Sequence, residues 1–228
     1  MLLPKVIIEY NYLLDSMFRE YFLLNPGNKK KTLMELKELF KNIENYKKEW
    51  KLYEERILTG LLKLLPIKFL HNVIDVYVVS WLFGKAGISK PLIIRGDFKK
   101  DRFVEILSHE IIHFFLTNND PKIFQSKITE KMFPKEKDLK TRNHIIVHAI
   151  QKYILLDVLK DNDRYIKDKE KASHTKCYKK SWDIVEEKGY LNIISDFKNR
   201  IEISINKKQV PLSTNEPIGT NIDNGIRE

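Results

Sequence analysis

Residues 107–115 have the sequence Leu-Ser-His-Glu-Ile-Ile-His-Phe-Phe, in which two histidines lie four residues apart and a glutamate follows the first. Around this stretch, apolar residues recur at helical spacing from residue 101 to residue 118, which predicts a helix. Residues four apart on a helix differ by only about 40° around the axis, so His109 and His113 can direct both imidazoles at one point. Glu110, about 100° further round, borders the same point. The stretch therefore predicts a helix that carries a metal site.

The expected metal is zinc. Two imidazoles held in this way suit a tetrahedral Zn²⁺ ion at roughly 2.0 to 2.1 Å from each ligating nitrogen. The five-residue pattern would occur by chance in roughly one chain in a hundred of this length. Neither its variable positions nor the two residues on either side are charged, as expected of a buried active-site helix. Glu110 is placed to act as a general base that takes a proton from metal-activated water.

A second histidine pair lies on the helix expected over residues 138–159. His144 and His148 are also four residues apart, so they share one face of that helix. Either can complete a three-histidine site with an open fourth position, which is a catalytic zinc arrangement. If neither binds the metal, acids such as Glu130 or Glu186 are the next candidates.

The motif resembles that of the zincins, the zinc metallopeptidases whose active-site helix carries His-Glu-x-x-His. The resemblance covers about residues 72–159 and implies peptide-bond hydrolysis, with a peptide or protein as the substrate. It also implies a small sheet before the active-site helix. The edge strand of that sheet would lie beside the cleft and pair with an extended substrate, and residues 91–96 would be that strand.

The third ligand distinguishes the zincin subclasses. A metzincin would have glycine and histidine three and six residues after the second motif histidine, where this chain has Leu116 and Asn119. In gluzincins a later helix supplies a glutamate, commonly within Asn-Glu-x-x-x-Asp. Residues 143–148 are Asn-His-Ile-Ile-Val-His, so histidine replaces both acids of a gluzincin-like pattern. The resemblance therefore favours His144 as the third zinc ligand, with His148 as a catalytic residue beside the metal that orients a ligand or donates to the oxyanion.

The rest of the 228-residue chain predicts a mostly helical α+β fold in one domain over residues 1–205. Helical spacing predicts helices over residues 6–22 and 32–65, so that residues 1–66 form a helical part. A catalytic part follows over residues 67–205, with strands expected at 72–81 and 91–96 and further helices at 122–132, 138–159 and 178–200. The sheet would have two or three strands and precede the active-site helix. Residues 206–228 are expected to form a disordered tail.

The formal net charge of +10 leaves a second function open. Most of the basic residues are lysines, which are typical of a solvated surface, whereas specific nucleic-acid recognition relies more on arginine. The alternative function is a basic helical nucleic-acid-binding protein with a structural or vestigial metal site. An intermediate possibility is a zincin that acts on nucleic-acid-bound proteins, as Spartan-type peptidases do.

Cysteine content and hydropathy limit the compartments and protein classes that remain possible. Cys177 is the only cysteine, which excludes an intrachain disulfide and a cysteine-based zinc finger and favours a reducing, cytoplasmic compartment. No run reaches the roughly 18 uncharged apolar residues that a membrane span requires, so no membrane partner is expected. Cys177 is expected to be a buried thiol rather than a nucleophile. His71 and His174 stand in no ligand spacing and are expected to be structural or surface residues.

Overall fold

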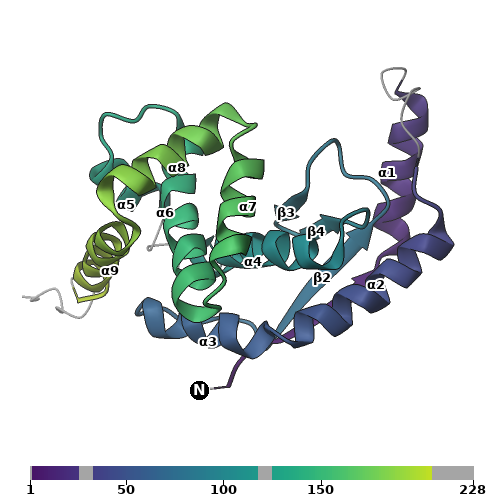
Figure 1. The fold of residues 1–228 in the computed structure, drawn as a ribbon, viewed down its shortest axis with the longest axis horizontal. Coiled ribbons are helices and arrows are strands. Elements are labelled where there is room, and N and C mark those ends of the chain that lie inside the picture. The colour runs from purple at the N-terminus through teal and green to yellow at the C-terminus, as the bar shows by residue number, and fades with distance from the viewer. Residues whose placement is uncertain (1, 26–32, 118–124, 207–228) are drawn as a thin grey trace, which may run out of the picture.

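The computed structural model describes residues 2–25, 33–117 and 125–206 and has the expected mostly helical α+β fold (Figure 1). The elements follow the order β1 (Lys5–Tyr10), α1 (Tyr12–Leu24), α2 (Leu36–Lys51), α3 (Glu54–Leu64), β2 (Val73–Val79), β3 (Gly87–Ser89), β4 (Leu92–Arg95), α4 (Lys100–Thr117), α5 (Gln125–Met132), α6 (Leu139–Tyr153), the π-helical turn η2 (Ile154–Val158), α7 (Asn162–Ala172), α8 (Lys176–Lys188) and α9 (Tyr190–Asn206). The tail predicted over residues 206–228 lies outside the described part except for Asn206, which is the last residue of α9.

The sheet has four strands in the order β1-β2-β4-β3 rather than the expected two or three. Strands β1, β2 and β4 are parallel, and β3 runs antiparallel to β4. The expectation that residues 91–96 form the edge strand is wrong, because β4 lies between β2 and β3. The edge strand next to β4 is β3, in a glycine-containing segment that the sequence predicts as a turn, and β1 is the opposite edge. Three residues are too few to show the alternation that identifies a strand.

The first predicted helix is also partly wrong. Lys5–Tyr10 is a strand that pairs with β2 from Lys5↔Val73 to Tyr10↔Val78, and α1 begins only after Asn11. The Asn11 side chain caps this helix by accepting a hydrogen bond from the Leu14 amide at 3.0 Å. Short apolar runs fit a helix or a buried strand equally well, and here the parallel partner β2 decides between them. Residues 1–66 are therefore not wholly helical, and their strand belongs to the same sheet as those of residues 67–205.

The later helices follow the predicted pattern with two additions. The stretch predicted at 178–200 is two helices, α8 and α9, separated by Gly189 at φ 78°, a conformation that favours glycine. Helix α7 was not predicted, because seven of its eleven residues are charged and hide its narrow apolar stripe. No described helix is long and apolar enough to cross a membrane.

Helix α4 lies at the centre of the molecule, with the sheet on one side and α6, α7 and α8 on the other (Figure 1). Its buried face carries Phe103, Leu107 and Ile111, each fully buried. Phe103 stacks on Tyr46 of α2 with ring centroids 3.9 Å apart. The Tyr46 hydroxyl donates to the carbonyl of Phe98 at 2.6 Å, which fixes the chain where it enters α4. The core thus holds α4 in place while its other face remains available for the motif side chains.

Asp15 links α1 to the end of the sheet. This fully buried carboxylate accepts hydrogen bonds from the amide and hydroxyl of Ser80, both at 2.6 Å, and from the Tyr10 hydroxyl at 3.1 Å. Ser80 directly follows β2 and begins the loop that leads to β3. The position of that loop therefore depends on one buried acid.

Asp15→Ala should lower the free energy of unfolding by about 1–3 kcal/mol, because the buried amide of Ser80 would lose its acceptor. Lys47→Ala is the control, since it breaks only an exposed ion pair with Glu44 and should have a much smaller effect. Urea denaturation followed by circular dichroism measures both values. Equal losses in the two variants would contradict the structural role assigned to Asp15.

Candidate metal centre

Four histidines from α4 and α6 meet in the interior of the molecule. The Nε2 atoms of His113 and His144 are 3.2 Å apart. The ring of His109 lies 5.6 Å from those of both His144 and His148, measured between centroids. One ring nitrogen each of His109, His113 and His144 lies within 4.8 Å of the other two, which forms a group able to hold a metal ion. His148 lies beside this group.

The protonation of His144 suits metal binding. Its Nδ1 lies 2.7 Å from the backbone carbonyl of Lys140, one helical turn earlier. A carbonyl can only accept, so Nδ1 carries the proton and Nε2 presents its lone pair toward His113. Two nitrogens bound to one tetrahedral zinc are about 3.3 Å apart by the geometry of the bond lengths. The separation between His113 and His144 fits that value.

His148 is held differently. It is 1% exposed, and its ring stacks on the indole of Trp182 at 4.5 Å. Its Nδ1 lies 2.8 Å from the hydroxyl of Ser181, which itself donates to the carbonyl of Tyr178 at 2.8 Å. With the hydroxyl proton used in this way, Nδ1 of His148 must be the donor to Ser181. His148 is therefore fixed by α8, and its Nε2 carries a lone pair.

Burial keeps the imidazoles uncharged. Burial, together with the adjacent imidazole of His144, lowers the pKa of His113 to about 3, and burial lowers the pKa of His144 to about 4. Burial also brings the pKa values of His109 and His148 well below the ordinary value, again with help from the neighbouring rings. All four are neutral at physiological pH, which is the form that binds a metal.

Glu110 lies against the edge strand. A Cβ atom added to Gly87 of β3 would come within 2.8 Å of the Glu110 Cγ and 2.9 Å of its Oε1. Burial raises the pKa of Glu110 to about 7, and the charge of Lys85 acts in the opposite direction. Gly87 is thus a site residue that the sequence did not identify, since only the packing of β3 on α4 shows why a side chain is excluded there.

Tyr178 of α8 is a second site residue that the sequence missed. Its ring centroid is 4.4 Å from that of His144 and 5.6 Å from that of His148. Burial, and then the charge of Glu110, raises the pKa of Tyr178 to about 12, so its hydroxyl remains protonated and can donate. No sequence pattern indicated Tyr178, because it lies far from both histidine pairs along the chain and only the packing of α8 on α6 brings it near them.

These groups line a cavity of about 520 Å³. Helix α4 supplies its floor, β3 and the preceding loop one wall, and α6 and α8 the other. At one end, Arg102 binds Glu105 at 2.6 Å and Asp168 at 2.5 Å, while Lys171 lies 3.7 Å from Glu105. These ion pairs fasten α7 to α4 and close that end of the cavity.

The other candidate residues lie apart from the metal group. Glu186 accepts from the Tyr165 hydroxyl at 2.6 Å and pairs with Lys152 at 2.7 Å, and Glu130 is exposed on α5. Among the other residues considered in the sequence, His71 and His174 are exposed and Cys177 is half-buried. The histidines are thus surface residues, and the thiol is less buried than the sequence analysis expected.

Comparisons with protein-family models, curated proteins and solved structures gave no match to this chain. The site is therefore interpreted from its own geometry. That geometry is a group of three histidines on two packed helices, arranged so that they could hold a metal ion, with Glu110 and Tyr178 beside them in one cavity.

Proposed function

We propose that this protein is a zinc metallopeptidase that hydrolyses peptide bonds with Glu110 as the general base. One observation carries the proposal: three neutral imidazoles converge at the floor of an open cavity that a carboxylate and a phenol also line. Imidazole nitrogens suit zinc as well as several other transition metals. Three imidazole ligands that leave the fourth coordination position of the metal free match a catalytic zinc arrangement. His109, His113 and His144 would be the ligands.

Zinc in such a site lowers the pKa of a water molecule and polarises the carbonyl group of the bond to be cleaved. Glu110 follows His109 on the same helix and faces the cavity without belonging to the metal group. It would take the proton from the attacking water and pass it to the departing amine. The backbone of Gly87, packed against the carboxylate, restricts the positions that Glu110 can adopt.

The substrate would lie along β3. This strand ends the sheet, and its residues Gly87, Ile88 and Ser89 line the cavity, so its outer edge can hydrogen-bond to an extended peptide. Tyr178 on the opposite wall would donate a hydrogen bond to the carbonyl oxygen as negative charge develops on it. His148, fixed by Ser181 and Trp182, would keep α8 and hence Tyr178 in register with the metal ligands.

The purified protein should contain about one zinc ion per chain, and His109→Ala or His113→Ala should lose it, because two remaining ligands bind too weakly. His174→Ala, which changes an exposed histidine outside the cavity, should retain the metal. Elemental analysis after dialysis measures the zinc content of each protein. Absence of metal from both the purified and the zinc-reconstituted protein would overturn the proposal.

Glu110→Gln should keep its zinc and its fold but lose about three orders of magnitude in peptide cleavage, because the amide has the same shape and cannot act as a base. Glu130→Gln, at an exposed glutamate of α5, should cleave as the wild type does. Turnover of internally quenched peptides, with chelation and re-addition of zinc, provides the measurement. Cleavage by Glu110→Gln at the wild-type rate would show that another group is the base.

The two histidines of α6 should differ in their effects. His144→Ala should weaken zinc affinity strongly, whereas His148→Ala should retain zinc and lower the catalytic rate. Competition with a chromophoric chelator gives the affinity, and turnover at saturating zinc gives the rate. Loss of zinc confined to His148→Ala would reverse the assignment of the third ligand. Equal and severe loss in both variants would indicate a four-histidine structural site.

The nucleic-acid-binding alternative predicts a different set of results. Such a protein would bind DNA or RNA with a steep dependence on salt and would cleave no peptide in the presence of any metal. The peptide-cleavage assay therefore separates the two functions directly.

A further inference from the structure

Two exposed lysines in the cavity wall, Lys85 and Lys140, form no ion pair with any residue that the structure describes. The cavity is lined by the basic residues Lys85, Arg102, Lys140 and Lys171 and by the acidic residues Glu105, Glu110 and Asp168. Arg102 and Lys171 are compensated by Glu105 and Asp168 at the closed end. Within residues 2–25, 33–117 and 125–206, neither Lys85 nor Lys140 forms an ion pair, and both are exposed. Their charges are therefore available to a bound molecule.

The two lysines belong to opposite walls of the cavity that contains the metal group. Lys85 lies two residues before Gly87, in the loop that leads into β3. Lys140 lies one helical turn before His144 on α6, with its ammonium group 4.9 Å from the ring centroid of Tyr178. The sheet and α6 lie on opposite sides of α4 (Figure 1), so a peptide along β3 would pass between the two charges.

The charge balance of the cavity favours an anion. Once the closed end is neutralised, Lys85 and Lys140 face Glu110 alone, and any metal ion held by the histidines adds further positive charge. A concave site with protein walls concentrates the field of such charges and raises the local concentration of oppositely charged ligands. A neutral or basic peptide would offer neither ammonium group an ion pair.

We propose that the cavity selects peptides that carry a carboxylate on each side of the bond to be cleaved, one for Lys85 and one for Lys140. This inference rests on the proposed peptidase function and names its substrate class. The carboxylates belong to aspartate or glutamate side chains or, on one side, to the C-terminus of the peptide. Both sources have the same charge and the same acceptor geometry for an ammonium donor.

The experiment measures binding, so that it does not depend on turnover. The protein is the Glu110→Gln variant, with and without one equivalent of zinc, in a buffer of about 50 mM salt, where exposed charges are weakly screened. The probes are two fluorescent octapeptides capped at both ends. One has two glutamates that flank the central residues, and the other has glutamine at the same two positions. We expect the glutamate peptide to bind about two- to thirtyfold more tightly by fluorescence anisotropy, the range given by two exposed ion pairs.

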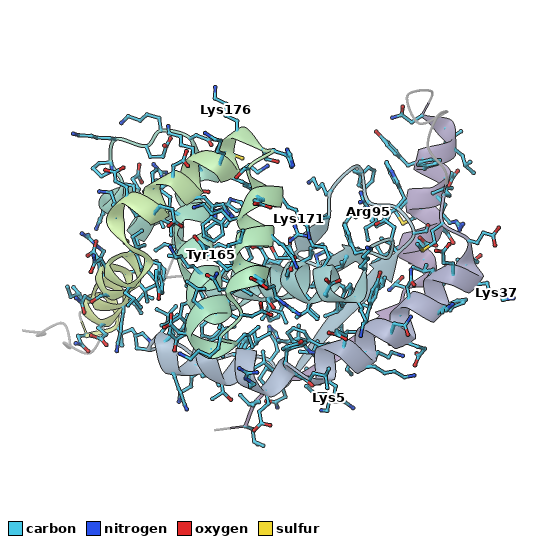
Figure 2. The ribbon with its side chains drawn as sticks, viewed as in Figure 1. Lys5, Lys37, Arg95, Tyr165, Lys171 and Lys176 are labelled. Atoms are coloured by element: carbon cyan, nitrogen blue, oxygen red, sulfur yellow. The ribbon has the colours of Figure 1, made fainter. Side chains whose placement is uncertain are left out.

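The lysines are then tested singly in the same background. Lys85→Gln and Lys140→Gln should each remove part of the preference for glutamate, and the double variant should remove it all. Lys37→Gln is the matched control, because Lys37 is also exposed and lies on α2, well separated from Lys171 at the cavity (Figure 2). It changes the net charge equally and should leave the preference intact. Equal binding of the two peptides, or an equal loss in Lys37→Gln, would overturn the inference.

Two further binding measurements identify the source of the recognised anion. The first probe is the glutamine peptide with a free C-terminal carboxylate. If it binds as tightly as the glutamate peptide, and if Lys85→Gln or Lys140→Gln removes this gain, that lysine recognises the C-terminus of the peptide. Displacement of the glutamate peptide by a single-stranded DNA oligonucleotide that depends on both lysines would overturn the inference in favour of nucleic acid.

The wild-type enzyme separates this inference from the proposed function. Cleavage of both peptides at equal kcat/KM would refute the acidic preference and leave the peptidase function standing. Lysine-dependent binding of the glutamate peptide without cleavage of any peptide would refute the function and leave the anion selectivity standing.

Discussion

The antiparallel packing of α4 against α6 is the contact on which the candidate site depends. Three residue pairs, spaced about one helical turn apart, join the two helices: Glu105 with Gln151, His109 with His148, and His113 with His144. Because these pairs follow the helical repeat, one correct alignment of the two helices places all four histidines together. A shift of α6 by a single turn would separate His113 from His144 and change which histidines face each other.

The same contact is costly for the fold. A polar side chain in the interior costs free energy unless it is hydrogen-bonded, and the histidines meet this requirement in part, through the carbonyl of Lys140 and the hydroxyl of Ser181. Their lowered pKa values reflect the remaining cost, because the interior disfavours their charged forms. A metal ion would offset this cost by giving the lone pairs a partner, so binding and stability would be coupled.

Two glycines mark close approaches of the sheet to neighbouring helices. A Cβ at Gly96 would overlap the Leu39 Cδ1 of α2, and one at Gly87 would meet the carboxylate of Glu110. A side chain at either position would have to displace the side chain of Leu39 or of Glu110. The close contact of the edge strand β3 with Glu110 therefore depends on a residue that has no chemistry of its own.

The sequence by itself determined the helical character of the chain, the helix that carries the histidine motif and the pairing of His109 with His113, because these follow from contacts within one helix turn. It also indicated His144 and His148 as candidates, and the resemblance favoured His144 as the third ligand. The tertiary structure decided what depends on long-range neighbours. It made residues 5–10 a strand through β2, made β3 the edge strand, and brought Tyr178 and Gly87 to the site. It also separated His144 from His148, since a backbone carbonyl holds one ring and a serine of another helix holds the other. Periodicity is local, whereas these partners are distant in the sequence and meet only when the helices pack.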